Sequence, residues 1–383
     1  MVASLTARGV RVSELDTLPK VAVILGAGAN IGIEGLGGGN TNPVWTPPLT
    51  RDLFGPKIRL REWEDVIAPY QGARNIAYRL DYSLRRDPEV NLEAQLNEFA
   101  NHPDQTTRVN FRFVAPFLRD LLRNVSRGYL AAQDPRTLHE LVTTLLTEVP
   151  KHHVAFITLN YDDFLEQALQ IYNPAEYQFT GMGHYVQANR QAKVFKLHGS
   201  INWVAPFGNE SSDWDAEVRT MEEPLAVLVE RMDVAKRDYA SVRDQPFQGT
   251  WLYPMLAVPM PGKAPLCPPI HTERMRDFLA NCRKVLVIGN SGLDDDLLGL
   301  IDSALPNVDA LHYVADITES ARMVAARFER RVKGFRWASS KRANSKIEYC
   351  TYPDEDVEPG REGIAGYVAS PEFSRFARFL PSA

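Results

Sequence analysis

Four short apolar runs limit the folds open to this chain more than any other feature. They are VAVIL (21–25), HVAFITL (153–159), KVLVIG (284–289) and ALHYVA (310–315). Each is rich in valine, isoleucine or leucine, and none alternates regularly with polar residues, which is typical of parallel strands buried on both faces. AKVFKLHG (192–199) predicts a fifth strand, and IEYCTY (347–352) an edge strand.

Helical patterns follow several of these runs. They begin at Asp162, Asp294 and Thr318, each a few residues after a predicted strand ends. Repeated strand–loop–helix units indicate an α/β fold, so we expect a Rossmann-like parallel sheet with helices on both faces.

The predicted strands are unevenly spaced, since the first ends at residue 25 and the second begins at residue 153. Such a gap is too long for one crossover, and apolar residues recur within it at helical spacing. We therefore expect a discontinuous domain interrupted by a large helical insertion. The expected segments are a Rossmann-like NAD-binding domain (15–57 and 150–355), a helical insertion module (58–149), a polar insertion (204–250) and a C-terminal tail (356–383).

Composition narrows the class of protein. The net charge of −5 argues against a basic nucleic-acid surface, so direct nucleic-acid binding is not expected. The cysteines, Cys267, Cys282 and Cys350, do not have metal-ligand spacing, which predicts no zinc site and fits a reducing compartment. The sequence shows no signal peptide and no run of about 18 apolar residues, so we expect a cytoplasmic protein without membrane contact.

The first apolar run leads into a glycine loop, GAGAN (26–30). A redox dinucleotide fold needs a third glycine where Ile31 stands, and a second strand that the following Gly- and Pro-rich stretch does not supply. Gly26 and Gly28 still allow backbone N–H groups to face a diphosphate, because they lack side chains. The alternative is a tight turn that binds nothing.

Three further stretches end predicted strands with polar residues, where ligands bind open α/β sheets. In ITLNYDD, Asn160 and Asp162 follow the strand, and the alternative for Asp162 is a helix cap. In VFKLHGS, His198 precedes a glycine and suits a general base, the alternative being a core histidine.

In VLVIGNSGLDDD, the third stretch, Gly289, Asn290 and Ser291 precede a helix N-terminus, a place for a ribose or a phosphate. For the adjacent run Asp294–Asp296, placement on the helix dipole is favoured over metal binding.

Together these stretches resemble the sirtuin-like (silent information regulator type) family. Gly26-Ala27-Gly28-Ala29-Asn30 is similar to the family's Gly-Ala-Gly-x-Ser, with Asn30 in place of serine. Thr158–Asp162 looks like Thr-Gln-Asn-Ile-Asp, Leu197–Gly199 like Leu-His-Gly, and Gly289–Ser291 like Gly-Thr-Ser. Deacylating members follow His-Gly with a four-cysteine zinc module and a strand that pairs with the acyl-lysine peptide. Both are missing from the pattern here.

The resemblance is nearest to NAD-cleaving sirtuin-like proteins of bacterial anti-phage defence, in particular the stand-alone subunit that partners a HerA-type ATPase. It implies an NAD+ glycohydrolase that uses NAD+ as substrate without zinc, forms a homo-oligomer, and has low basal activity controlled by its partner. The alternatives are an NAD-dependent protein deacylase or ADP-ribosyltransferase, and a non-catalytic nucleotide-sensing or DNA-associated subunit.

The resemblance also implies residue roles. The Gly26–Asn30 loop would hold the diphosphate, Asn160 the nicotinamide ribose and a water, and Asp162 the carboxamide or the cationic ring. His198 would act as base. The adenosine side would be contacted by Asn290, Ser291 and, at the end of LHYVAD, Asp316, for which helix capping is the alternative.

Overall fold

The computed structural model describes most of the chain. The described residues are 20–30, 53–54, 61–87, 90–132, 134–209, 212–223, 225–243, 249–260, 262, 265–290, 295–304, 308, 310–315, 326–327, 330, 347–351 and 363–378.

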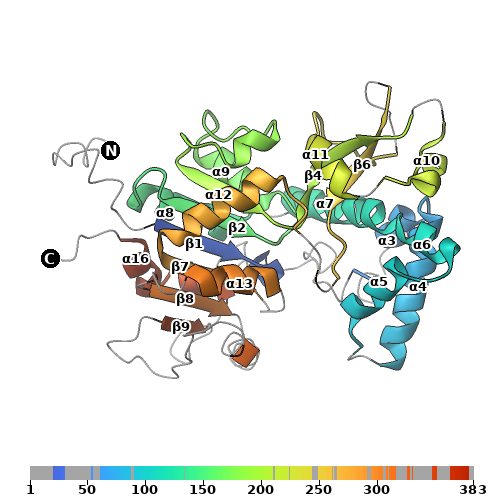
Figure 1. Cartoon of the computed structure of the whole chain (residues 1–383). Helices are drawn as coiled ribbons and strands as arrows, with labels where there is room; N and C mark the ends of the chain where they lie inside the picture. The colour runs from blue at the N-terminus through green and yellow to red at the C-terminus, as the bar shows by residue number, and fades with distance from the viewer. Residues whose placement is uncertain are drawn as a thin grey trace.

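A six-stranded parallel sheet occupies the left part of the molecule as seen in Figure 1. Its strands, in the order in which they lie, are β3 (Ala192–Lys196), β2 (Val154–Thr158), β1 (Lys20–Leu25), β7 (Cys282–Ile288), β8 (Ala310–Ala315) and β9 (Ile347–Thr351). All six predicted strands are confirmed. The chain runs outward from β1 in one direction and from β7 in the other, which is the doubly wound order of Rossmann-like sheets.

Helices cover both faces of this sheet, as expected. α12 (Pro269–Ala280) and α13 (Asp295–Ala304) pack together on the face toward the viewer in Figure 1. α8 (Arg136–Glu148), α9 (Phe164–Tyr172), α15 (Gly363–Val368) and α16 (Pro371–Ala377) form a second group, in which α8 contacts the other three. The segment expected as a C-terminal tail therefore contains two helices, and their Tyr367 and Phe376 side chains are buried.

Within the described residues, five helices precede α8 between the first two strands. They are α3 (Arg61–Ile67), α4 (Gln71–Arg86), α5 (Leu92–Ala100), α6 (Gln105–Phe111) and α7 (Val114–Ala132). Side chains fix two of their starts, because Asn91 accepts the Ala94 N–H and Asp104 accepts the Thr107 N–H. These helices confirm the large helical insertion; where its boundaries lie stays a prediction. None of the helices within the described residues is both long and apolar enough to cross a membrane.

A small antiparallel sheet was not predicted. It contains β4 (Gly199–Phe207), β5 (Asp233–Val234) and β6 (Trp251–Leu256), with β4 in the middle, and α10 (Trp214–Thr220) and α11 (Leu225–Arg231) lie between its strands in sequence. The chain passes from the large sheet to this one at Gly199, whose φ of +79° favours glycine. A Cβ there would lie 2.1 Å from the Met255 carbonyl oxygen.

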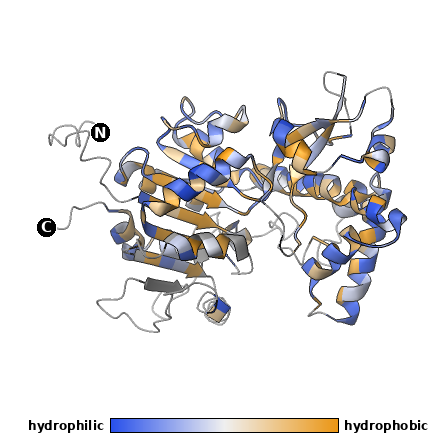
Figure 2. Cartoon of the chain, in the orientation of Figure 1, coloured by the Kyte–Doolittle hydropathy of each residue, from blue (hydrophilic) through white to orange (hydrophobic). Residues whose placement is uncertain are grey.

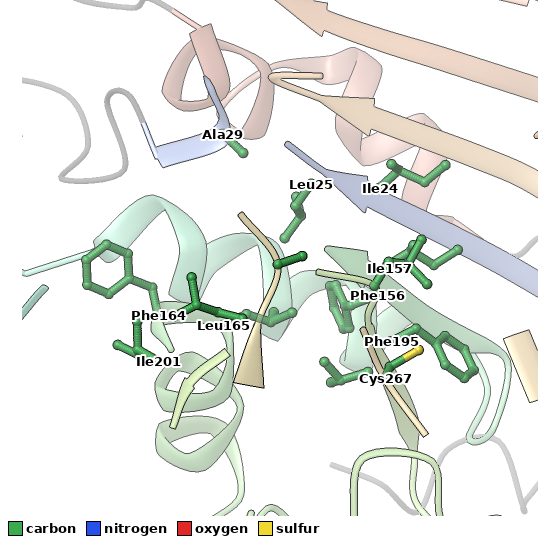
Figure 3. Close-up of a cluster of buried hydrophobic side chains, with 14 of the residues drawn as sticks. Ile24, Leu25, Ala29, Phe156, Ile157, Phe164, Leu165, Phe195, Ile201 and Cys267 are labelled. Atoms are coloured by element: carbon green, nitrogen blue, oxygen red, sulfur yellow. The ribbon is translucent and has the colours of Figure 1, made fainter. Parts of the chain in front are cut away.

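The hydrophobic core consists of apolar side chains packed between the parallel sheet and its helices. Orange apolar residues concentrate in the strands and on the inner faces of the helices, while polar residues face outward (Figure 2). Figure 3 shows Ile24 and Leu25 of β1, Phe156 and Ile157 of β2, and Phe195 of β3, with Phe164 and Leu165 of α9 nearby; all are buried. This packing fixes the carboxyl ends of the strands, where the polar residues of interest follow.

Candidate functional site

Four strands end level at one edge of the large sheet. Leu25 pairs with Thr158 on one side and with Ile288 on the other, and Thr158 pairs with Lys196. The loops after β1, β2, β3 and β7 therefore meet at this edge. The edge includes the point between β1 and β7 where the strand order reverses, which is where ligands bind doubly wound sheets.

The glycine loop lies directly against the loop that follows β7. The chain after β1 forms a 3-10 turn, η1 (Ala27–Asn30). The Gly26 N–H donates to the Ile288 carbonyl at 2.9 Å, and the Gly28 N–H donates to the Gly289 carbonyl at 3.0 Å. A Cβ on Gly26 would lie 2.5 Å from the Gly289 carbonyl oxygen.

These contacts change the interpretation of the glycines. They permit two loops to cross closely, and the N–H groups of Gly26 and Gly28 donate to protein carbonyls. Binding of a diphosphate by the Gly26–Asn30 loop stays a prediction that depends on its other groups.

Asn30, Asn160 and Asp162 form a polar cluster at this edge. The Asn30 side-chain N–H donates to Asp162 Oδ2 at 2.6 Å, and the Asn160 side-chain N–H reaches Asn30 Oδ1 at 3.4 Å. Asn30 and Asn160 are each only 8% exposed. Asn160 Oδ1 is buried and accepts no hydrogen bond from any residue that the structure describes. An unsatisfied buried acceptor is costly, so this oxygen is suited to a ligand hydroxyl or a water.

Asp162 also contacts the start of α9, whose N-cap residue is Asp163. The Asp162 Oδ1 accepts the N–H of Phe164, the first residue of that helix, at 3.2 Å, so its carboxyl supports the helix start and belongs to the cluster. Burial of the carboxyl raises the pKa of Asp162, while the Lys196 ammonium and the Asn30 hydrogen bond oppose that rise.

Sequence reasoning missed a buried ion pair beneath this cluster. Lys196 is 0% exposed, and its ammonium donates to Glu166 Oε1 at 3.0 Å and to the backbone carbonyl of Asp162. Burial raises the pKa of Glu166, and the charge of Lys196 lowers it. The one sequence signal was a lysine inside an apolar strand, next to the Leu-His-Gly motif.

A second missed pair connects the cluster to the helical insertion. Arg127 of α7 donates to both oxygens of Asp163, at 3.1 and 2.9 Å. Asp163 also accepts from Gln167 at 2.9 Å and from Asn202 of β4 at 3.0 Å. Asp163 directly follows Asp162, so α7 contacts the loop that carries the polar cluster.

His198 lies at the same edge, partly exposed, two residues after β3 ends. Its ring centroid is 6.2 Å from that of Tyr161, and its backbone carbonyl accepts the Ala257 N–H at 2.8 Å. The Tyr161 hydroxyl donates to the Ala257 carbonyl at 2.6 Å. Strand β3, the loop after β2 and the segment after β6 are thereby joined around the imidazole.

The structure describes only part of the group predicted on the adenosine side. Asn290 is buried, and its backbone carbonyl accepts the Tyr313 hydroxyl at 3.0 Å. Gly289 has a φ of +61° where it crosses the glycine loop. Ser291, Asp294 and Asp316 lie outside the described residues, so their predicted roles stay predictions. Among the residues that are described, no three His, Cys, Asp or Glu side chains gather where they could hold a metal ion.

Comparison with family models finds a match for part of the chain. Residues 154–333 match the family model described as SIR2-like domain. No protein of curated function shows a significant match.

Several solved structures are similar at low identity. A Sir2 homologue in complex with NAD is 14% identical over 95% of this chain and 93% of its own, with a TM-score of 0.40. A Sir2 homologue mutant in complex with ADP-ribose is 14% identical over 79% of this chain and 84% of its own, with a TM-score of 0.36. Sir2Tm bound to a propionylated peptide is 12% identical over 78% of this chain and 82% of its own, with a TM-score of 0.35. By the family match, residues 154–333, which include Asn160, Asp162 and His198, are similar to the SIR2-like domain family.

Proposed function

We propose that the chain is a sirtuin-like NAD+ glycohydrolase, which converts NAD+ and water to nicotinamide and ADP-ribose. The observation that carries the proposal is the Asn30–Asn160–Asp162 cluster, with its unsatisfied Asn160 Oδ1, at the point where the strand order reverses. The similarity of residues 154–333 to the SIR2-like domain supports NAD+ as the substrate.

The reaction breaks the bond between the ribose and the positively charged nicotinamide nitrogen. Nicotinamide leaves as a neutral molecule with the bonding electrons, so a strong general acid is not needed. The ribose develops oxocarbenium character, which a nearby carboxylate stabilises. Water then forms the new bond to the anomeric carbon and loses one proton.

The described residues supply these needs. Asn160 Oδ1 would accept a hydrogen bond from a ribose hydroxyl or the attacking water and so fix its position. Asp162, hydrogen-bonded by Asn30, would place its negative charge near the cationic ring. His198 would accept the proton of the water or of a ribose hydroxyl and release it to solvent. Asn290 and Ser291 would contact the adenosine side.

The pairing of β4 favours hydrolysis over deacylation. An extended peptide binds by adding to an open strand edge. β6 pairs with β4 at Gly199 and again from Val204 to Phe207, with a register shift between them. Within that gap, the Ile201 N–H donates to the Tyr161 backbone carbonyl at 2.9 Å, and the Asn202 carbonyl accepts the Ala235 N–H at 2.8 Å. Main-chain groups of the strand after His198 are therefore already bonded within the chain, which supports water as the acceptor of ADP-ribose.

The biological setting belongs to the same proposal. By its resemblance, the chain would deplete NAD+ as an anti-phage defence effector. It would act as a homo-oligomer whose low basal activity rises on assembly with a HerA-type ATPase. An effector left fully active would harm its host, so control by assembly is expected.

Release of nicotinamide from NAD+ by the purified chain tests the proposal, measured with and without the co-expressed ATPase. An acyl-lysine peptide in a parallel assay separates deacylation. Peptide-dependent nicotinamide release would favour the deacylase. NAD+ binding without release would favour a nucleotide-sensing subunit.

A further inference from the structure

The buried Lys196–Glu166 pair has no role in the mechanism above. Lys196 is 0% and Glu166 3% exposed, and their side chains meet at 3.0 Å. A buried ion pair is seldom more stabilising than well-packed apolar side chains of the same size. Its presence in the core therefore calls for another explanation.

The second acceptor of the ammonium supplies that explanation. Lys196 Nζ also donates to the backbone carbonyl of Asp162, in the loop that carries the proposed site. Asp162 is thus held at three points, since Asn30 binds one carboxyl oxygen and the Phe164 N–H binds the other. Lys196 itself ends β3, two residues before His198. One ammonium group thereby links the loop of Asn160 to the strand that presents His198.

Glu166 keeps the ammonium in place. The Tyr185 hydroxyl donates to the same Glu166 oxygen at 3.2 Å, and Tyr185 packs edge-on against Trp203, with ring centroids 5.2 Å apart. Both aromatic side chains are buried. Because its partners are fixed by packing, Lys196 has little freedom to leave the Asp162 carbonyl.

We propose that Lys196, supported by Glu166, is a positioning residue for the nicotinamide-ribose site. Its ammonium fixes the Asp162 carbonyl, so that Asn160 and Asp162 keep the orientation that cleavage requires. Its charge also favours the ionised form of the Asp162 carboxyl. This inference rests on the proposed function, and it concerns a residue that does not touch the substrate.

Lys196→Met tests this role, since it keeps most of the side-chain volume and removes the charge and the donor. Lys193→Met is the matched control, because it makes the same change on the same strand and Lys193 contacts Phe278 instead. We expect Lys196→Met to lower kcat by about 10- to 100-fold with a smaller change in KM, since small displacements of reacting groups cost that much. Lys193→Met should stay within about twofold of the parental chain.

The pH profile separates positioning from a merely structural role. The charged groups that act on the Asp162 carboxyl are Lys196 from β3 and the adjacent Asp163. Lys196 in turn binds Glu166 of α9, and Asp163 binds Arg127 of α7. Removing the Lys196 charge should move the acid limb of kcat to higher pH. Lys196→Arg keeps the charge and should restore that limb toward the parental position.

The outcomes are distinguishable from a failure of the proposed function. A folded Lys196→Met variant with parental kcat and an unmoved acid limb would overturn the inference. If Lys196→Met does not fold, Glu166→Gln decides by its kcat, and a folded Glu166→Gln variant with parental kcat would overturn the inference. If the parental chain binds NAD+ without cleaving it, the proposed hydrolysis fails. The inference then requires Lys196→Met to weaken NAD+ binding at least about tenfold, and unchanged binding would overturn it.

Discussion

At the scale of single residues, the site is built from side chains that lie far apart in sequence. Asn30, Asn160 and Asp162 share hydrogen bonds across more than one hundred positions. Sequence patterns placed each of them after a strand, and the level ends of the strands explain why they meet. The Lys196–Glu166 and Arg127–Asp163 pairs could not be predicted, because such partners are set by tertiary packing and not by local spacing.

Gly26 provides a test of the loop crossing. Gly26→Ala places a methyl group 2.5 Å from the Gly289 carbonyl oxygen, so one of the two loops must shift. We expect the free energy of unfolding to fall by about 1–3 kcal/mol. Gly183→Ala is the control, since no atom lies within 4 Å of the added Cβ. Equal stability of the two variants in urea unfolding would contradict this crossing.

Asp162 predicts an acid limb of activity. Burial raises the pKa of the Asp162 carboxyl. It therefore protonates at a higher pH than an ordinary aspartate, whose pKa is about 3.9. If its negative charge stabilises the transition state, kcat falls as pH drops through that raised pKa. Asp162→Asn should have low kcat at neutral pH and should lack this limb. A parental pH profile in Asp162→Asn would remove Asp162 from the mechanism.

At the scale of elements, α7 joins the helical insertion to the loop that follows β2. Figure 1 shows α7 running from the insertion toward the loops beyond the strands. Its Arg127 binds Asp163 and Asp238, whereas its Arg123 binds Asp238 and the side chain of Asn124. The amphipathic patterns identified these helices, but they could not show which side chains would contact the site.

Arg127→Met should therefore slow nicotinamide release. Losing the two hydrogen bonds to Asp163 loosens the loop that carries Asp162, and we expect kcat to fall about tenfold. Arg123→Met removes a neighbouring arginine that does not contact Asp163, so its kcat should remain near parental. Equal effects of the two substitutions would indicate general destabilisation of α7 and not control of the site.

The two sheets differ in how well sequence predicted them. The parallel strands were recognised because both of their faces are buried, which leaves short continuous apolar runs. β4 and β6 lie in the antiparallel sheet, where β4 contains polar and partly exposed residues, Asn202 and Pro206 among them. Its partner strand lies beyond a long polar segment, so pairing was not visible from local pattern.

At the scale of the whole molecule, buried histidines make stability depend on pH. Burial lowers the pKa of His271 and of His312 to about 4. His312 hydrogen-bonds Tyr367 at 2.8 Å and so joins the sheet to the C-terminal helices. Because the folded-state pKa is depressed below about 6.5, the stabilisation is complete above pH 6.5 and is lost as pH falls toward 4.

Urea unfolding between pH 7 and pH 4 measures this loss. The free energy of unfolding should fall by about 1.4 kcal/mol for each pH unit and each histidine in that window. The free energy of unfolding of His312→Gln should fall less steeply with acid than that of the parental chain. A slope that His312→Gln does not alter would contradict the account of this contact.

The most direct test of the central claim is nicotinamide release from NAD+ by the purified chain and by Asn160→Ala, with and without the ATPase. Asn160 contributes an unsatisfied buried oxygen, so its loss should spare folding and lower turnover by about 100-fold. Asn75→Ala, an exposed site on α4, is the control. Release by the parental chain that disappears only in Asn160→Ala is the predicted result. Equal release by Asn160→Ala would contradict the site, and no release by the parental chain under any condition would contradict the hydrolase.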